Sequence, residues 1–185
     1  MIHDNSLQDE TAFVSDTNSP GILLGACGWN HAHWLGDFYP HDLPQDWYLS
    51  YYANEFSAVL LPENQWQNNL MALEEWAFDV SESFRFYLHS RCSAGNSGAI
   101  NPLSAAKALA GRFAGIVNIP PGEHHIQVDK AAGVAVINMA SQDMRGWRHW
   151  LEQHAPALQA VFLNDESLSY QQLSDFKTLL ELMGV

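Results

Sequence analysis

The chain has 185 residues, enough for one domain with a sizeable core and too few for two ordinary domains. A hydrophobic content of 47% and an aromatic content of 12% exclude wholesale disorder. The 8 Lys and Arg against 21 Asp and Glu give a net charge of -13, which argues against nucleic acid or an anionic membrane as a partner.

Cysteine usage and the N-terminal sequence favour a reducing compartment. The chain has two cysteines, Cys27 and Cys92, and lacks a basic start followed by an apolar run. We therefore expect a cytoplasmic protein with reduced thiols. No window approaches the roughly 18 uninterrupted apolar residues of a membrane span, so we expect no membrane association.

The first part of the chain is typical of alternating strands and helices. Residues 1–20 are polar and acidic, so we expect a flexible tail before a single domain at 21–185. An apolar run bounded by glycines at 22–28 predicts a strand buried on both faces, as in parallel sheets. Pro44 opens an amphipathic helix that runs to Phe56, and a second buried strand follows at 58–61.

The middle of the chain continues the alternation. Apolar residues at helical spacing between Leu70 and Val80 predict a helix, and 84–88 predicts a third strand. Pro102 opens a further helix, which we expect to reach Val117 because Ala106, Ala110, Phe113 and Val117 fall on one helical face.

The last part of the chain predicts two more strands and two more helices. Residues 118–130 contain Pro-Pro-Gly, so we expect a loop with a possible edge strand at 125–128. Strands follow at 133–139 and 160–163, each with a helix after it. The pattern is β-α repeated about five times, which predicts an α/β protein with either a barrel-like closed sheet or an open one.

The opening residues also match a known family in order and spacing. The residues that carry the match are Gly25, Gly28, Trp29, Trp34, Gly36, Phe38, Tyr39, Pro40, Leu43, Pro44, Leu49, Tyr52, Ala53, Phe56 and Val59. In these positions the chain resembles the YecE-like family, known as domain of unknown function 72. The family's Phe-x-Phe strand resembles 84–86, and its closing strand resembles 161–165.

The resemblance implies a TIM-barrel-derived α/β fold, shortened here to about five mainly parallel strands flanked by helices. The activity of the family is not established. The chain departs from the family at polar positions: the family's glutamate, asparagine and lysine fall on Leu60, Pro62 and His89, and a last-strand asparagine falls on Leu163. The central strands with the family's arginine-histidine pair have no counterpart. The chain therefore resembles a divergent member that has lost most of the polar pocket residues.

Candidate site residues come from the carboxyl ends of the predicted strands, where loops converge and sites are built. The catalytic candidates are His31, His89 and Asp165. The ligand-binding candidates are Trp29, Asn30, His33, Asn64, Trp66, Arg91, Asn138 and Asn164. Together they predict an aromatic-walled polar pocket.

Other motifs favour ordinary structural roles. His31 and His33 have a spacing compatible with a shared metal ion, completed by His89 or Asp165, but we expect exposed loop histidines and neither metal nor cofactor. A nucleophilic cysteine paired with His89 is the less favoured interpretation of the thiols. The loop at 93–98 lacks the lysine of a phosphate-binding loop, and Trp76, Trp147 and Trp150 are expected to pack in the core or an interface.

Two hypotheses for the function remain. The first is a non-catalytic binding or interaction protein, with a small polar ligand and a homodimer that covers the sheet edges exposed by the missing strands. The second is a hydrolase- or isomerase-like enzyme for a small polar substrate such as a sugar or sugar phosphate, using His31, His33, His89 and Asp165. Convergence of those four side chains on one concave site would favour the enzyme.

Overall fold

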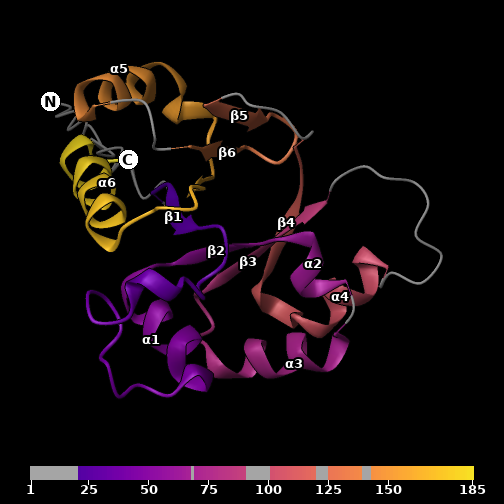
Figure 1. The fold of residues 1–185 in the computed structure, drawn as a ribbon. Helices are drawn as coiled ribbons and strands as arrows, with labels where there is room; N and C mark the ends of the chain where they lie inside the picture. The colour runs from indigo at the N-terminus through magenta and orange to yellow at the C-terminus, as the bar shows by residue number, and fades with distance from the viewer. Residues whose placement is uncertain (1–20, 68, 91–100, 120–124, 139–142) are drawn as a thin grey trace, which may run out of the picture.

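The computed structural model describes residues 21–67, 69–90, 101–119, 125–138 and 143–185, and it has a mixed α/β fold (Figure 1). The described strands are β1 (Leu23–Ala26), β2 (Ala58–Leu61), β3 (Arg85–Ser90), β4 (Phe113–Asn118), β5 (Ile126–Asp129), β6 (Val134–Ile137) and β7 (Ala160–Leu163). The described helices are α1 (Tyr48–Glu55), α2 (Glu63–Trp66), α3 (Leu70–Asp79), α4 (Pro102–Ala108), α5 (Met144–His154) and α6 (Tyr170–Met183). Short 3-10 turns are η1 (Ala32–Trp34), η2 (Gln45–Trp47), η3 (Ala110–Arg112) and η5 (Ala155–Ala157).

The strands form two sheets that are mainly parallel. One sheet has the order β1-β7-β6-β5 and the other has the order β2-β3-β4, and every pair is parallel except β5 with β6. Among the described residues, one parallel bridge, between Cys27 and Leu60, joins the two sheets. In Figure 1, α5 and α6 lie together beside the first sheet, whereas α1, α3 and α4 lie along the second. Over the described residues the strands do not close into a barrel.

The junction between β1 and β2 depends on a close backbone approach. A Cβ atom on Gly25 would lie 1.9 Å from the carbonyl oxygen of Ala58, so only glycine fits at this position. Beside it, the Tyr52 hydroxyl accepts a hydrogen bond from the Ala26 N–H (2.8 Å) and donates one to the Ala58 carbonyl (2.9 Å). One side chain of α1 therefore connects the two strands where a direct ladder bond is missing.

Alternate residues of the strands belong to two separate apolar clusters. An inner cluster contains no helix residue and consists of Ala58, Leu60, Tyr87, Val117, Ile119, Val134, Val136, Ala160 and Phe162, with Leu23, Cys27 and Ala132 packed against it. The intervening strand residues, such as Val59, Phe86 and Val161, pack with the helices in an outer core. The period of two of a β-strand explains this division, because successive side chains point to opposite faces.

The open side between β4 and β5 is spanned by one buried carboxylate. Asp129 is 9% exposed, and its Oδ2 accepts a hydrogen bond from the Asn118 N–H at 2.8 Å. Its Oδ1 accepts from the N–H groups of Ala131 (3.0 Å) and Ala132 (3.1 Å) in the turn before β6. Asp129 thus connects the end of β4 to the β5–β6 hairpin. The homodimer predicted to cover the strand edges stays a prediction.

One helix prediction was wrong, and it changes the strand count. The helix opened by Pro102 ends at Ala108, and the chain continues through η3 into β4. Ala110 has a φ of 50°, which interrupts the helix, and the β-branched Ile116 and Val117 favour a strand after it. The possible edge strand at 125–128 is confirmed as β5, so the described residues contain seven strands instead of about five.

Other predictions lie at or beyond the limits of the described structure. The tail predicted at 1–20 and the loop at 93–98 fall outside the described residues, as do Arg91 and Cys92. Among the helices of the described segments, none combines the length and apolar character that a membrane crossing demands. The predicted cytoplasmic location stays a prediction.

Candidate functional site

The loop after β1 is fixed by an aromatic cluster. The Trp34 indole is fully buried and donates a hydrogen bond to the Leu168 carbonyl at 2.6 Å. The buried Tyr39 hydroxyl donates to the Trp29 carbonyl at 2.7 Å, and the Tyr39 ring stacks on Tyr48 of α1 at 4.1 Å. These contacts hold the backbone of Trp29 in place, so the Trp29 side chain points toward α3 from a rigid support.

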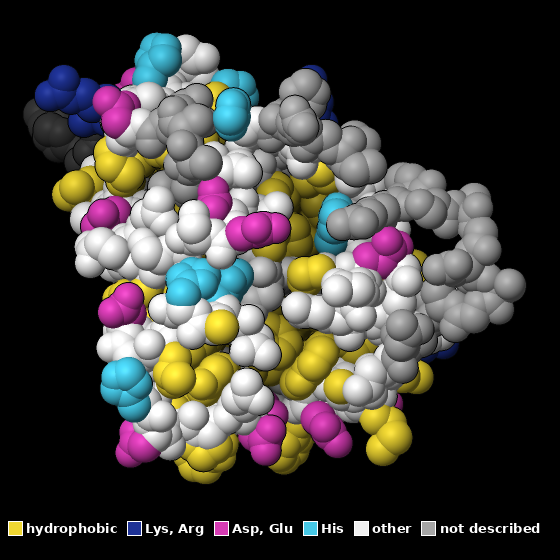
Figure 2. Space-filling model, viewed as in Figure 1, with side chains coloured by type: hydrophobic (Ala, Val, Ile, Leu, Met, Phe, Trp, Pro, Cys, Tyr) yellow, Lys and Arg dark blue, Asp and Glu magenta, His cyan; other side chains and the backbone are white. Residues whose placement is uncertain are grey.

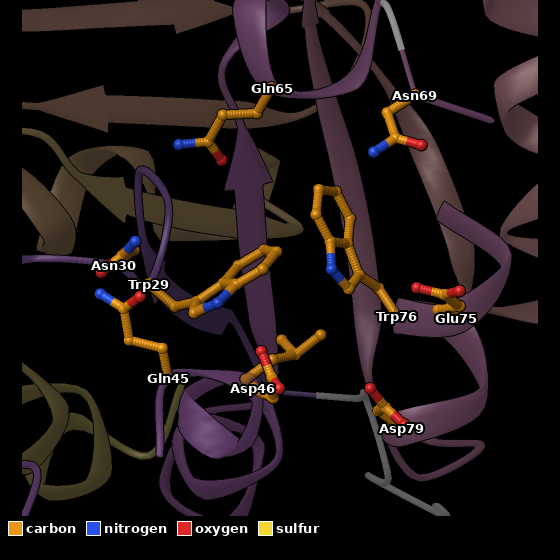
Figure 3. A pocket seen from close by; sticks show the side chains of 10 residues that line it. Trp29, Asn30, Gln45, Asp46, Gln65, Asn69, Glu75, Trp76 and Asp79 are labelled. Atoms are coloured by element: carbon orange, nitrogen blue, oxygen red, sulfur yellow. The ribbon is translucent and has the colours of Figure 1, made fainter. Parts of the chain in front are cut away.

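A pocket of about 510 Å³ lies between this loop, α1 and α3, and we call it the tryptophan pocket (Figure 3). It is lined by Trp29, Asn30, Gln45, Asp46, Leu49, Gln65, Asn69, Glu75, Trp76 and Asp79. Figure 3 shows the two indoles near the centre, with Gln65 and Asn69 on one side and Asp46 on the other. Its volume falls within the range of ~300–1,000 Å³ that is usual for small-molecule sites.

Two indole rings form the apolar wall of the tryptophan pocket. The rings of Trp29 and Trp76 meet edge to face, with centroids 4.9 Å apart and an interplanar angle of 85°. Trp29 is buried and Trp76 is half-buried. Edge-to-face packing is a favourable aromatic geometry, so each ring helps to fix the orientation of the other.

The rest of the pocket lining is polar and carries only negative charge. Three carboxylates, on Asp46, Glu75 and Asp79, face the pocket, and none of their side chains has a hydrogen bond or an ion pair with any described residue. Among the described lining residues none is Lys, Arg or His. Figure 2 shows the same bias over one whole face, where acidic side chains are widespread and Lys and Arg lie at the margins.

Four amides add directional hydrogen-bonding groups to the tryptophan pocket: those of Asn30, Gln45, Gln65 and Asn69. The Asn69 side chain also caps α3, because it accepts a hydrogen bond from the Ala72 N–H at 3.1 Å. This cap fixes the start of the helix that contributes Glu75, Trp76 and Asp79. The polar groups of the pocket therefore come from several elements: the loop after β1, η2, α2 and α3 with its N-cap.

A second, smaller cavity of about 130 Å³ lies at the carboxyl ends of the parallel strands, and we call it the strand-end cavity. It is lined by Cys27, Leu60, Pro62, His89, Ile119, Gln127, Val136 and Asn164. Burial raises the pKa of the Cys27 thiol to about 12, so the thiol is protonated at neutral pH and is a poor nucleophile. The His89 Nε2 lies 3.3 Å from the Ile119 carbonyl oxygen.

The two loop histidines of the sequence prediction are structural neighbours of Trp34. The His31 ring packs on Trp34 with centroids 4.2 Å apart, its buried Nε2 has no partner in the described structure, and burial lowers its pKa. His33 donates from Nε2 to the Leu168 carbonyl at 2.6 Å. The two imidazole rings are 5.7 Å apart. No group of three His, Cys, Asp or Glu able to hold a metal ion is found among the described residues.

The remaining candidates have local roles or lie outside the two cavities. Asp165 accepts hydrogen bonds from the Ser167 hydroxyl (2.6 Å) and N–H (2.8 Å), and these bonds lower its pKa. The buried Trp66 indole donates to the His89 carbonyl at 3.0 Å. Asn64 and Asn138 are exposed and line neither of the two cavities.

The structure therefore brings the candidates together in two small groups. Trp29 and Asn30 line the tryptophan pocket, and His89 and Asn164 line the strand-end cavity. No described cavity contains His31, His33, His89 and Asp165 together. The part of the tryptophan pocket that comes from η2, α2 and α3 was not predicted from the sequence. A usable signal was present in α3, where residues 75, 76 and 79 share one flank at helical spacing.

Comparisons with known proteins agree on one family. The model of the family described as "Protein of unknown function DUF72" matches residues 23–100. No curated protein matches the chain. A DUF72 family protein from Thermotoga maritima MSB8 superposes with a TM-score of 0.60 at 10% identity, over 87% of this chain and 99% of the relative. A DUF72 family protein from Enterococcus faecalis V583 superposes with a TM-score of 0.52 at 9% identity, over 89% and 98%.

Identities this low bear on the fold alone, and both solved structures support a common α/β architecture. The family match covers the segment on which the sequence resemblance rests. The predicted resemblance is confirmed: residues 23–100 of this chain match the model of the DUF72 family, whose function is unknown.

Proposed function

We propose that this chain is a non-catalytic binding protein that holds a small polar molecule in the tryptophan pocket. The observation that carries the proposal is the combination of two fixed indoles, four amides and three unpaired carboxylates around one cavity of about 510 Å³. An apolar wall with a few oriented polar groups is the usual composition of a ligand site. Trp29 and Asn30 are the two predicted ligand-binding residues that belong to this site.

The strand-end cavity supports the non-catalytic part of the proposal. Catalytic groups of barrel enzymes come from the carboxyl ends of the strands. Here that position is lined by Leu60 and Pro62, at two of the positions where the chain departs from the family's polar residues. No carboxylate is among its described lining residues, and its thiol is protonated. A general acid-base pair or an activated nucleophile is therefore missing from this lining.

We also propose that the fold derives from a TIM barrel. The strands follow one another around an arc in the order β4-β3-β2-β1-β7-β6-β5, in which the first strand lies beside the last and all neighbours in sequence except β4 and β5 are adjacent. The inner cluster is built from alternate strand residues and no helix residue, as the filled interior of a barrel is. The Asp129 connection lies where the arc would have to close.

An enzyme using the strand-end cavity is the second candidate, and one observation favours it. Cys27 and His89 line the same cavity, as a nucleophilic cysteine paired with His89 would require. Against it, the cavity of about 130 Å³ is smaller than usual ligand pockets of ~300 Å³ or more. The thiol would also need a lower pKa to act at neutral pH.

The proposal is tested by binding measurements on the untagged, full-length protein. Tryptophan fluorescence is titrated with glucose, glutamine and glucosamine, and a native mass spectrum reports any molecule retained from expression. We expect at least one probe to change the emission, and Asn30→Ala to weaken its binding. Asn64→Ala is the matched control, because Asn64 is exposed and lies outside the pocket lining. A protein that carries no added mass and responds to no probe would refute the binding function.

A further inference from the structure

The charged side chains that line the tryptophan pocket are all acidic, and the inference that we draw from this rests on the proposed function. We infer that its ligand is a small organic ammonium ion that also carries hydrogen-bonding groups, such as an amino sugar or an amino alcohol. The inference follows from three properties of the pocket lining: its unpaired carboxylates, its indole surfaces and its amides.

The carboxylates set the sign of the ligand charge. Asp46 comes from η2, whereas Glu75 and Asp79 come from α3, so negative charge enters the pocket from two elements. None of these three side chains has a cationic partner among the described residues. Like charges that share a cavity repel one another, and a bound cation relieves that repulsion. An anionic ligand such as a sugar phosphate would add to it.

The spacing of the carboxylates argues for an organic cation over a metal ion. Within the described residues no group of three His, Cys, Asp or Glu is close enough to hold a metal. Carboxylates arranged around a wide cavity fit a larger ion whose charge is carried on a molecular body. The pocket volume of about 510 Å³ leaves room for such a body.

The indoles and the amides of the pocket set two further requirements for the ligand. The face of an indole attracts a cation through its π electrons, and the pocket is lined by Trp29 and Trp76, of which Trp76 is the more exposed. The side-chain amides of Asn30, Gln45 and Gln65 can donate and accept hydrogen bonds. A cation without polar substituents would leave these amide groups without a partner. The best match is therefore an ammonium group with hydroxyl or amide substituents.

Isothermal titration with two matched pairs of probes tests the charge preference. Glucosamine is compared with glucose, and choline is compared with its uncharged carbon isostere, dimethylbutanol. We expect the charged member of each pair to bind more tightly, and its affinity to fall at high salt, because salt screens the attraction. Equal binding of charged and uncharged members overturns the inference and leaves the proposed function standing. No binding by any of the four overturns the inference, and the proposed function fails with it if glutamine also gives no response and no added mass is retained.

A pair of variants on one helix separates the pocket from the overall acidity. Glu75→Gln removes a lining carboxylate, whereas Glu74→Gln removes an exposed carboxylate on the same helix that does not line the pocket. We expect Glu75→Gln to weaken glucosamine binding by about five-fold, near the upper range for an exposed ion pair, and Glu74→Gln to change it little. Equal losses in both variants would mean that net charge alone attracts the probe, and the inference fails.

Discussion

The Tyr52 hydroxyl makes the connection between the two sheets testable by a single-atom deletion. Tyr52→Phe keeps the ring, which packs against Phe56 and Phe84, and removes the oxygen that bonds the Ala26 N–H and the Ala58 carbonyl. Both backbone groups are buried at the β1–β2 junction, and Tyr52 is fully buried. The deletion therefore leaves one donor and one acceptor without a partner in the core.

The magnitude follows from the two groups that lose their partner. A buried polar group without a hydrogen bond costs about 1–3 kcal/mol, so the free energy of unfolding should fall by about 2–5 kcal/mol. For a chain of this size a loss of about 3 kcal/mol lowers the Tm by roughly 6–12 °C. Burial raises the pKa of the Tyr52 hydroxyl, so it stays protonated and the loss should be the same at neutral and mildly alkaline pH.

Urea unfolding followed by circular dichroism measures the effect. Tyr51→Phe is the matched control, because Tyr51 is on the same helix, is 36% exposed and makes no hydrogen bond through its hydroxyl in the described structure. We expect the control to stay within about 0.5 kcal/mol of the wild type. A Tyr52→Phe variant equally close to the wild type would refute the reasoning, and would mean that β1 and β2 pair directly once the hydroxyl is removed.

Three further predictions concern titratable groups. Asp129→Ala should lower the free energy of unfolding by about 2–4 kcal/mol in urea melts, because three backbone N–H groups lose a charged acceptor; a smaller loss would contradict the connection between β4 and β5. Burial lowers the pKa of His31, so the unfolded chain binds the proton first and stability should fall as pH decreases below about 6.5. His31→Phe should reduce this loss of stability at low pH, measured as melts at a series of pH values. An unchanged dependence of stability on pH would mean that another group causes the loss. In a Cys92→Ser background, Cys27 should react slowly with iodoacetamide at neutral pH, because its pKa is about 12; fast alkylation would reveal a thiolate.

The fold could be predicted to the extent that burial leaves a pattern in the sequence. Strands such as β2 and β7 are buried at every position, and their uninterrupted apolar residues predicted parallel strands correctly. β4 lies at the end of its sheet and is only partly buried, so it lacks that run of apolar residues. Phe113 and Val117 are four residues apart, a spacing that fits a helix as well as a strand. The helix ends at Ala108, and the positive φ that follows it falls on Ala110 and not on the neighbouring Gly111, so the break is poorly marked in the sequence.

Only the part of the candidate site that follows the end of a strand could be predicted from the sequence. Trp29 and Asn30 follow β1, so the rule for strand ends found them. The opposite wall depends on how α3 is rotated, because Leu73 and Ala77 face the core and thereby turn Trp76 toward the loop after β1. That rotation is a tertiary property. A tryptophan on a helix is more often a packing residue, and sequence alone gave no reason to prefer a pocket here.

The position of the tryptophan pocket in the chain gives a reason to test it before the strand-end cavity. Every residue that lines the pocket lies between Trp29 and Asp79, inside the segment that matches the DUF72 family. The strand-end cavity instead needs Ile119, Gln127, Val136 and Asn164, which lie beyond that segment. If the ligand site belongs to the family segment, pocket variants such as Asn30→Ala should weaken binding, whereas Asn164→Ala should leave it unchanged. The opposite result would place the site at the strand ends and revive the enzyme hypothesis.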